Sequence, residues 1–567
     1  FDGDVRFNDP GIPVFSNSGI MSLGNVATNW FQFDTTWQGT DSLTWTHGAH
    51  TLIFGAELRK LITSRSAVNT PNGQFTFSSG ASGFTGLTQA DLLLGIPTSV
   101  ITPGPELRNQ VAAWRDGFFV VDNWQASKRL TLNLGVRYEL PTVPYTVNGF
   151  ATMLNAEQTA IIPANAPVPG FEFIEPNHKN FAPRVGLAYR VGDKTVIRAG
   201  YGIYYNPNQT NSFTFLSINP PFGAVVTCTS TTATPLISLN APTPPSACGT
   251  ASIFNIITPN RKLPTQYMNQ WSFNVQRALW TGAGLEIGYL GSHSTHLDRS
   301  YYNNSPYVPG PGTVNPRRPN LRFAEIRTIQ NDENANYHHM TIILRQRLSH
   351  GLALNASYTW AHALDVTTDS NGGGAPMNPY NWRADYGNSN WDVRHRFVAQ
   401  FNYALPFFNS ASSAFVRSAL GGWQTNGLVT LQTGFPFNVV QSGDPANTGR
   451  SGINRPNLVG TASANCGDGH LTACIDPSAF AATGFAYGNF GRNVLFGPGL
   501  YIVDFSLFKS FSIRERARVQ FRSEFFNLFN TPAFSNPSAT FGTSTFGNIT
   551  STKRDNRQIQ FALKFLF

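Results

Sequence analysis

The stretch RQIQFALKFLF occupies residues 557–567, at the end of the sequence. Its large apolar side chains stand at every second position: Ile559, Phe561, Leu563, Phe565 and Phe567. Alternate residues of a β-strand point to the same face, so these five share one face and the intervening residues share the other. The pattern predicts an amphipathic strand. Such a strand can pack on a soluble β-sandwich, or it can face lipid while its other side faces a polar lumen.

The composition favours the membrane alternative. Only 13% of the 567 residues are charged, whereas soluble domains have roughly 25%. No apolar run approaches the ~18 residues of a membrane-spanning helix. Only helices and closed barrels satisfy their backbone hydrogen bonds in lipid, so any membrane-spanning part of this chain must consist of strands.

The basic charge balance does not indicate a nucleic-acid partner. The chain has 40 lysines and arginines against 31 acidic residues, a formal net charge of +9. The cations are scattered singly, and no cluster forms a patch that could follow a phosphate backbone. We therefore expect no binding to nucleic acid.

Alternation of apolar and polar residues recurs along the whole chain. RLTLNLGVRYE (129–139) and GLALNASYTWAH (351–362) are examples, each close to the ~9 to 11 residues that a tilted strand needs to cross a bilayer. The predicted strands are 29–46, 50–62, 116–126, 129–139, 181–190, 194–205, 269–279, 283–291, 335–348, 351–362, 392–405, 421–433, 500–511, 517–529 and 557–567.

The connections between these strands alternate in length. Successive pairs are joined by short turns, apart from a medium connection at 406–420, and long segments rich in Pro, Gly, Asn and Ser separate the pairs. Outer-membrane barrels have short periplasmic turns and long extracellular loops. The sequence therefore predicts an all-β, antiparallel transmembrane β-barrel. The strand 557–567 would face lipid and end at the periplasmic rim, where the barrel assembly machinery would recognise it.

The direction of the strands predicts that the barrel is incomplete. If 557–567 descends to the periplasm, 29–46 descends too, so residues 1–28 would be extracellular, whereas a barrel is expected to start on the periplasmic side. About 15 strands are predicted, and single-chain bacterial barrels have even numbers. Against a transporter barrel of about 22 strands, about 7 would be missing. We therefore expect residues 1–567 to form one barrel domain that is truncated at its N-terminus.

The four cysteines fall as two local pairs in loop-like stretches, Cys228 with Cys248 and Cys466 with Cys474. Two disulfides that form in an oxidising compartment explain this arrangement best. A metal site is the less favoured alternative, because His470 between the last two cysteines lacks the doubled ligand spacing of a zinc site.

Four longer phrases stand out: NFAPRVGLAYRVGDKTVIRAGYGIYYNP (180–207), NYHHMTIILRQRLSHGLALNASYTWAHALD (336–365), DVRHRFVAQFNYALPF (392–407) and VQFRSEFFNLFNTPAFSNP (519–537). They resemble the barrel of Oar-like TonB-dependent transporters, and the resemblance runs over nearly the whole chain, with the phrases in family order. It implies a 22-strand barrel of the bacterial outer membrane, occluded by an N-terminal plug and energised from the inner membrane through TonB. We expect the signal peptide, the regulatory-like module and the plug of that family to be absent from residues 1–567.

No catalytic, metal-binding or cofactor-binding motif stands out in the sequence, so we expect neither an enzyme nor a cofactor. His395 is expected to join a rim network with Asp392, Arg394 and Arg396. Charged residues that alternation places on the lumenal face of their strands are better candidates for a function. They would form either a hydrated wall of ion pairs or contacts to a plug. They are Glu57, Arg59, Arg137, Glu139, Arg184, Arg198, Glu286, Arg345, Asp504, Arg522 and Glu524.

The function these features favour is TonB-coupled uptake of a large or scarce solute across the outer membrane. The expected partners are outer-membrane lipid, the plug, the TonB complex, the barrel assembly machinery and an unidentified solute. An adhesion or structural barrel that binds partners through its loops is the main alternative. An open diffusion pore and a soluble array of sandwiches are weaker ones.

Overall fold

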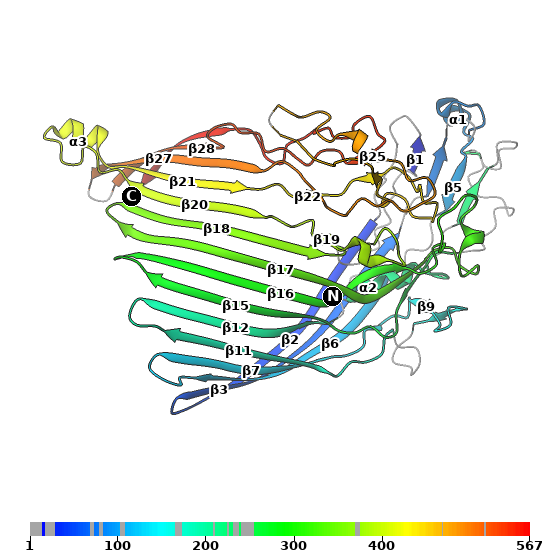
Figure 1. Ribbon diagram of the computed structural model, residues 1–567, viewed down its shortest axis with the longest axis horizontal. Helices are drawn as coiled ribbons and strands as arrows, with labels where there is room; N and C mark the ends of the chain where they lie inside the picture. The colour runs from blue at the N-terminus through cyan, green and yellow to red at the C-terminus, as the bar shows by residue number, and fades with distance from the viewer. Residues whose placement is uncertain are drawn as a thin grey trace.

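The structure of the chain is a computed structural model, and its regular elements are mostly strands (Figure 1). It describes residues 14–17, 29–68, 73–78, 83–102, 108–164, 173–207, 210–223, 226–230, 238–239, 254–368, 375–467, 469–514 and 517–567.

Fifteen long strands form one antiparallel meander, in which each strand pairs with the next long strand along the chain. The expected antiparallel transmembrane wall is thereby confirmed, whereas a total of 22 strands stays a prediction. The long strands are β2 (Asn29–His47), β3 (His50–Val68), β6 (Arg108–Trp124), β7 (Leu130–Pro141), β11 (Asn180–Arg190), β12 (Thr195–Asn206), β15 (Gln266–Ala278), β16 (Ala283–Tyr302), β17 (Ile326–Ser349), β18 (Leu352–Asp365), β20 (His395–Ala404), β21 (Trp423–Gln432), β27 (Leu500–Arg514), β28 (Ala517–Phe526) and β30 (Gln558–Leu566).

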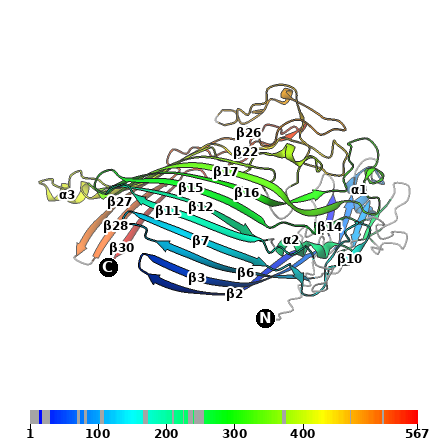
Figure 2. The same cartoon turned by 60° about the horizontal axis from the view of Figure 1, so that its bottom comes forward.

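The sheet curves into a trough rather than lying flat (Figure 2). Within the described residues, its first strand β2 pairs only with β3, and its last strand β30 pairs only with β28. The described part of the chain is therefore a curved wall with two edges.

The two faces of the wall differ in chemistry. Large apolar side chains are exposed on the outer face, where Phe181 is 57% exposed and Leu563 is 74% exposed. The C-terminal stripe continues this face, because Phe561 stacks on Phe521 of the neighbouring strand with ring centroids 6.4 Å apart. A surface of this kind is stable against lipid hydrocarbon and would aggregate in water.

The two ends of the strands also differ. Tight hairpin turns gather at one end of the sheet, and most of the small elements gather at the other (Figure 1). The β17–β18 hairpin turns at His350 and Gly351, whose φ angles are 52° and 80°. Positive φ at both central positions defines the type I′ turn that matches the twist of paired strands. These differences fit the expected periplasmic turns and extracellular loops.

Several strands are longer than the sequence predicted. β6 begins at Arg108, and β17 begins at Ile326, well before the predicted starts at 116 and 335. Their added residues keep pairing with the neighbouring strands beyond the part that alternates apolar and polar residues. The alternation reports only contact with lipid, so it could not reveal strands that continue above the membrane.

The remaining elements are short. None of the helices in the described ranges is long and apolar enough to span a membrane. The helices are α1 (Thr88–Leu94), α2 (Thr210–Thr214), α3 (Ala414–Leu420), η2 (Phe215–Ile218), η3 (Asn315–Arg317), η4 (Trp382–Asp385) and η5 (Pro477–Ala479). The short strands are β1 (Val14–Asn17), β4 (Gln74–Phe77), β5 (Ser99–Thr102), β8 (Tyr145–Thr146), β9 (Thr152–Leu154), β10 (Ile161–Pro163), β13 (Val226–Thr229), β14 (Ile256–Pro259), β19 (Gly387–Asn388), β22 (Pro436–Phe437), β23 (Val440–Gln441), β24 (Asn457–Leu458), β25 (Phe480–Ala481), β26 (Leu495–Phe496) and β29 (Thr540–Phe541).

Candidate functional site: the inner wall and the loop cap

The inner face of β3, β6 and β7 carries a compact charge network. Arg137 lies between two carboxylates: its Nη2 is 2.8 Å from Glu57 Oε2, and its Nε also donates to Glu139. Arg59 Nη2 is 2.8 Å from the second oxygen of Glu57. The Arg137 guanidinium lies over Gly117 of β6 and leaves no room there for a Cβ atom. Four of the predicted lumenal residues therefore form one connected group.

A second group lies further round the wall, on β12, β15, β16 and β17. Arg345 Nη1 is 2.8 Å from Glu286 Oε2, and Asn274 Nδ2 donates to the other oxygen at 2.7 Å. Arg198 donates to Gln276 on the adjacent strand. Because the Arg345 side chain is 57% exposed, this pair is hydrated and contributes at most about 1 kcal/mol.

The other predicted lumenal residues do not join either group. Arg522 Nε donates to Gln520 Oε1 at 2.8 Å, and Asp504 Oδ1 accepts from the backbone N–H of Asn527 at 2.8 Å. The Arg184 guanidinium lies 4.5 Å from the ring of Tyr204. Glu524 stands opposite Gln560 in the ladder. The eleven residues are thus spread along the wall and do not converge on one site, and their role as plug contacts stays a prediction.

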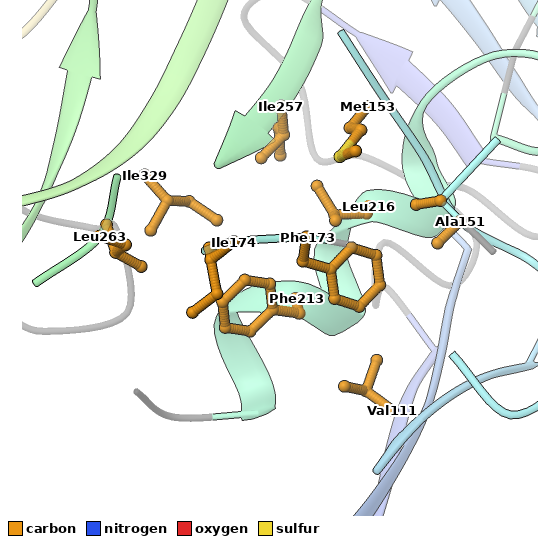
Figure 3. Close-up of a cluster of buried hydrophobic side chains, with 11 residues drawn as sticks. Val111, Ala151, Met153, Phe173, Ile174, Phe213, Leu216, Ile257, Leu263 and Ile329 are labelled. Carbon is orange, nitrogen blue, oxygen red and sulfur yellow. The ribbon is translucent and has the colours of Figure 1, made fainter. Parts of the chain in front are cut away.

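Part of the inner face is covered by the chain itself. Phe213 and Leu216, in the α2–η2 segment, are fully buried with Val111 of β6 and Phe173 in an apolar cluster (Figure 3). Phe173 and Phe213 stack with ring centroids 5.3 Å apart. This cluster, which we call the mouth core, lies at the loop end of the wall.

Polar contacts hold the mouth core on the wall. Thr63 of β3 and Thr210 share a hydrogen bond of 2.6 Å, and Asn109 of β6 donates to the carbonyl oxygen of Thr214 at 3.1 Å. Thr63 and Asn109 point inward with Glu57 by strand parity. The segment therefore folds over the lumenal side. The sequence prediction treated 206–268 only as a long loop, because no short-range pattern shows that a loop turns inward.

The loops after β18 and β21 are joined by buried ion pairs. Arg455 Nη2 lies 2.5 Å from Asp385 Oδ1, and these side chains are 3% and 5% exposed. Arg455 also donates to the carbonyl oxygen of Phe490 at 2.7 Å. Arg492 binds Asp365 at 2.7 Å. These contacts make the loops one packed body, which we call the loop cap.

Glu333 is an unusual acid beside the cap. It lies at the loop end of β17, outside the membrane-spanning part, and is 1% exposed. Thr367 donates to its Oε2 at 2.7 Å, and burial raises its pKa to about 8. At neutral pH this carboxyl group is therefore mostly protonated.

A disulfide secures the apolar part of the cap. Cys466 and Cys474 are joined, as predicted, beside a cluster that contains Ile475, Phe480 and Phe490. The other predicted pair, Cys228 with Cys248, cannot be followed because Cys248 lies outside the described residues.

The predicted rim network around His395 is only partly correct. Arg394 Nη2 binds Asp392 at 3.0 Å, as expected. His395 instead shares a 2.8 Å hydrogen bond with the Tyr358 hydroxyl on the outer face. Adjacent strand residues point to opposite faces, so His395 and Arg396 cannot join the same cluster.

Arg396 lines an inner cavity of about 440 Å³ at the loop end of β20, β21 and β27. Lys553 and Arg554 reach the same cavity from the segment between β28 and β30, and Asp504 supplies a carboxylate. We call it the cationic cavity. The sequence prediction missed it, because two of its cations come from a loop more than a hundred residues away along the chain.

No group of three or more His, Cys, Asp or Glu side chains in the described ranges is arranged to hold a metal ion.

A lipid-exposed outer face, a charged inner face and a capped mouth define a transmembrane β-barrel protein of the outer membrane. Residues 3–560 match the family model described as "Outer membrane beta barrel domain". The chain belongs to this family, and its localisation is the bacterial outer membrane. No curated protein matches the chain.

Solved structures show a similar fold. The outer membrane transporter YddB from Escherichia coli aligns with a TM-score of 0.52 and 10% identity, over 95% of this chain and 55% of YddB. The ferripyoverdine receptor of Pseudomonas aeruginosa aligns with a TM-score of 0.49 and 12% identity, over 96% of this chain and 50% of the receptor. The chain thus spans about half the length of these proteins. The expected outer-membrane β-barrel fold is confirmed, and the finer resemblance to Oar-like members stays a prediction.

Proposed function

We propose that the protein is an outer-membrane transporter that takes up a solute in a TonB-dependent manner. The observation that carries this proposal is the contrast between the two faces of the wall: the outer face is apolar, whereas the inner face carries the Glu57–Arg137–Glu139 group. An inward face with both signs of charge suits a hydrated lumen that holds a removable plug.

The loop cap supports the same proposal. Its buried ion pairs and apolar cluster give the extracellular side a fixed shape, and a fixed shape suits selective capture of a solute before transport. The plug, its TonB-binding segment and the whole protein's solute belong to this proposal. No chemical reaction is part of it.

The test compares uptake in two host strains that differ only in TonB. The intact protein is expressed in both, and loss of solutes from a defined medium is followed by mass spectrometry. We expect at least one solute to disappear faster only when the protein and TonB are both present. Equal loss in both strains would contradict energised transport, and ion conductance of the purified protein without energy would favour an open pore. Binding to cells or matrix without TonB-dependent uptake would favour adhesion.

A further inference from the structure

The cationic cavity differs from the rest of the inner wall in how its charges are used. Elsewhere most of the predicted inward arginines have an acidic or an amide partner, such as Arg137 with Glu57 and Arg522 with Gln520. Arg396, Lys553 and Arg554 make no ion pair and donate no side-chain hydrogen bond within the described residues. Unpaired cations that share a cavity repel one another, so their arrangement calls for a counter-charge.

The single carboxylate in the cavity does not supply that counter-charge. Asp504 Oδ1 already accepts the backbone N–H of Asn527 at 2.8 Å, and three cations outnumber it. The cavity therefore has an excess of positive charge, carried by three residues that solvent still reaches, and this excess favours an anion over a neutral ligand.

The cavity is also held in shape before any ligand arrives. The Lys553 backbone N–H donates to Ala533 O at 2.6 Å, and Phe534 forms a β-bridge with Thr552. These contacts join the segment that carries Lys553 and Arg554 to Ala533 and Phe534 of the same loop. A preformed site loses little conformational entropy on binding.

The other half of the lining is apolar. Phe435 and Phe534 lie beside Val398, Leu428 and Ile502, and the Lys553 Nζ lies 5.0 Å from the centre of the Phe435 ring. Burial against this lining lowers the pKa of Lys553, although the residue as a whole is exposed. The volume of about 440 Å³ falls within the ~300 to 1,000 Å³ of small-molecule sites.

We infer that the cationic cavity is a binding site for a small amphipathic organic anion, whose carboxylate or similar acidic group contacts Arg396, Lys553 and Arg554 while its apolar part packs on Phe435 and Phe534. Guanidinium groups bind such acidic groups through paired, charge-assisted hydrogen bonds. The inference deepens the proposed function, on which it rests, by naming the chemical class of solute that the mouth would capture.

The test measures binding to the purified intact protein in non-ionic detergent, without TonB or energy. The probes are 2-naphthoate and its neutral analogue 2-naphthamide, followed by isothermal titration calorimetry. We expect 2-naphthoate to bind at least roughly tenfold more tightly than 2-naphthamide, because one charge-assisted hydrogen bond accounts for about a tenfold change or more. Raising the salt concentration should weaken only the binding of the acid.

Variants locate the binding. Arg396→Gln and Lys553→Gln should each weaken 2-naphthoate binding roughly tenfold. The matched control Lys564→Gln removes an inward cation of β30 outside the cavity and should leave binding unchanged. Migration of the unheated protein in gels checks that each variant is folded.

Several results would overturn the inference: no binding of 2-naphthoate, equal binding of the acid and the amide, or the same affinity in wild type, Arg396→Gln and Lys553→Gln. The outcome is independent of the uptake test. Anion binding without TonB-dependent uptake would support this site and contradict the transport proposal. Uptake without anion binding would contradict this site and support the transport proposal.

Discussion

The buried pair between Arg455 and Asp385 allows the sharpest prediction about the loop cap. Asp385→Asn keeps the shape of the side chain but removes its charge, which leaves the Arg455 guanidinium 3% exposed and without an ionic partner. Removing one member of a buried pair costs about 3 to 5 kcal/mol. The cap should therefore open far more often, while the transmembrane wall stays folded.

Native-state hydrogen exchange reads this opening directly. The backbone N–H of Gln441 donates to Asn454 O at 2.7 Å within the cap. Since each 1.4 kcal/mol corresponds to a tenfold change, Asp385→Asn should speed exchange of this amide roughly a hundredfold or more.

Two further variants make the reasoning testable. The double variant Asp385→Asn/Arg455→Met should recover part of the loss, because it leaves no buried charge unpaired. Glu286→Gln breaks the pair with Arg345, which is 57% exposed, and should cost less than about 1 kcal/mol. Exchange that changes less than threefold in Asp385→Asn, or a double variant that loses the sum of both single losses, would refute the reasoning.

Three other predictions concern pH, the C-terminus and the disulfide. Burial raises the pKa of Glu333 from 4.5 to about 8, so between these pH values the folded protein holds a proton that the unfolded chain has released. Stability against urea should therefore fall as pH rises through this window, and Glu333→Gln should remove that fall; an unchanged pH profile in the variant would contradict it. Phe567→Gln should lower the yield of folded barrel in outer-membrane fractions, because it removes the last apolar side chain of the stripe, whereas Lys564→Gln on the opposite face should not; equal yields would count against an assembly role. Replacing Cys466 and Cys474 with serine should destabilise the cap locally by about 2 to 3 kcal/mol, because the loop between them is no longer closed in the unfolded chain. Hydrogen exchange of the Asn465 backbone amide, which donates to Cys474 O at 3.0 Å, should become faster. Unchanged exchange would mean that the apolar cluster around Phe480 is sufficient to hold the loop.

The sequence was most informative where each side chain faces either lipid or the lumen. In β7 and β30 side chains face lipid and lumen alternately, so the alternation of apolar and polar residues predicts the strand, its faces and its partners. Alternation places the C-terminal stripe on one face of β30 and places Glu57, Arg137 and Glu139 on the inner face. Arg137 reaches Glu57 across β6 because Gly117 between them has no side chain, and the sequence pattern did not predict that contact.

The parts that could not be predicted depend on contacts between distant loops. Phe213 and Leu216 join the mouth core with Met153 and Val111, but no local pattern distinguishes such a loop from one that extends into solvent. Likewise, the sequence placed Arg396 in a charged run with its neighbours. In the structure its side chain points to the inner face and lines a cavity that Lys553 completes. These contacts are fixed by tertiary packing between distant segments. Loops have no regular alternation of apolar and polar residues from which such contacts could be predicted.

The most direct test of the central claim, that this chain forms a membrane-spanning wall with one lipid face and one lumenal face, is a spin-label scan of β7 in lipid bilayers. Single cysteines at Thr131, Leu132, Asn133 and Leu134, in a background without the four native cysteines, would each carry the label. Accessibility to oxygen, which concentrates in lipid, should peak at Leu132 and Leu134, and accessibility to a water-soluble nickel complex should peak at Thr131 and Asn133. Equal accessibility at all four positions, or the opposite phase, would contradict the account.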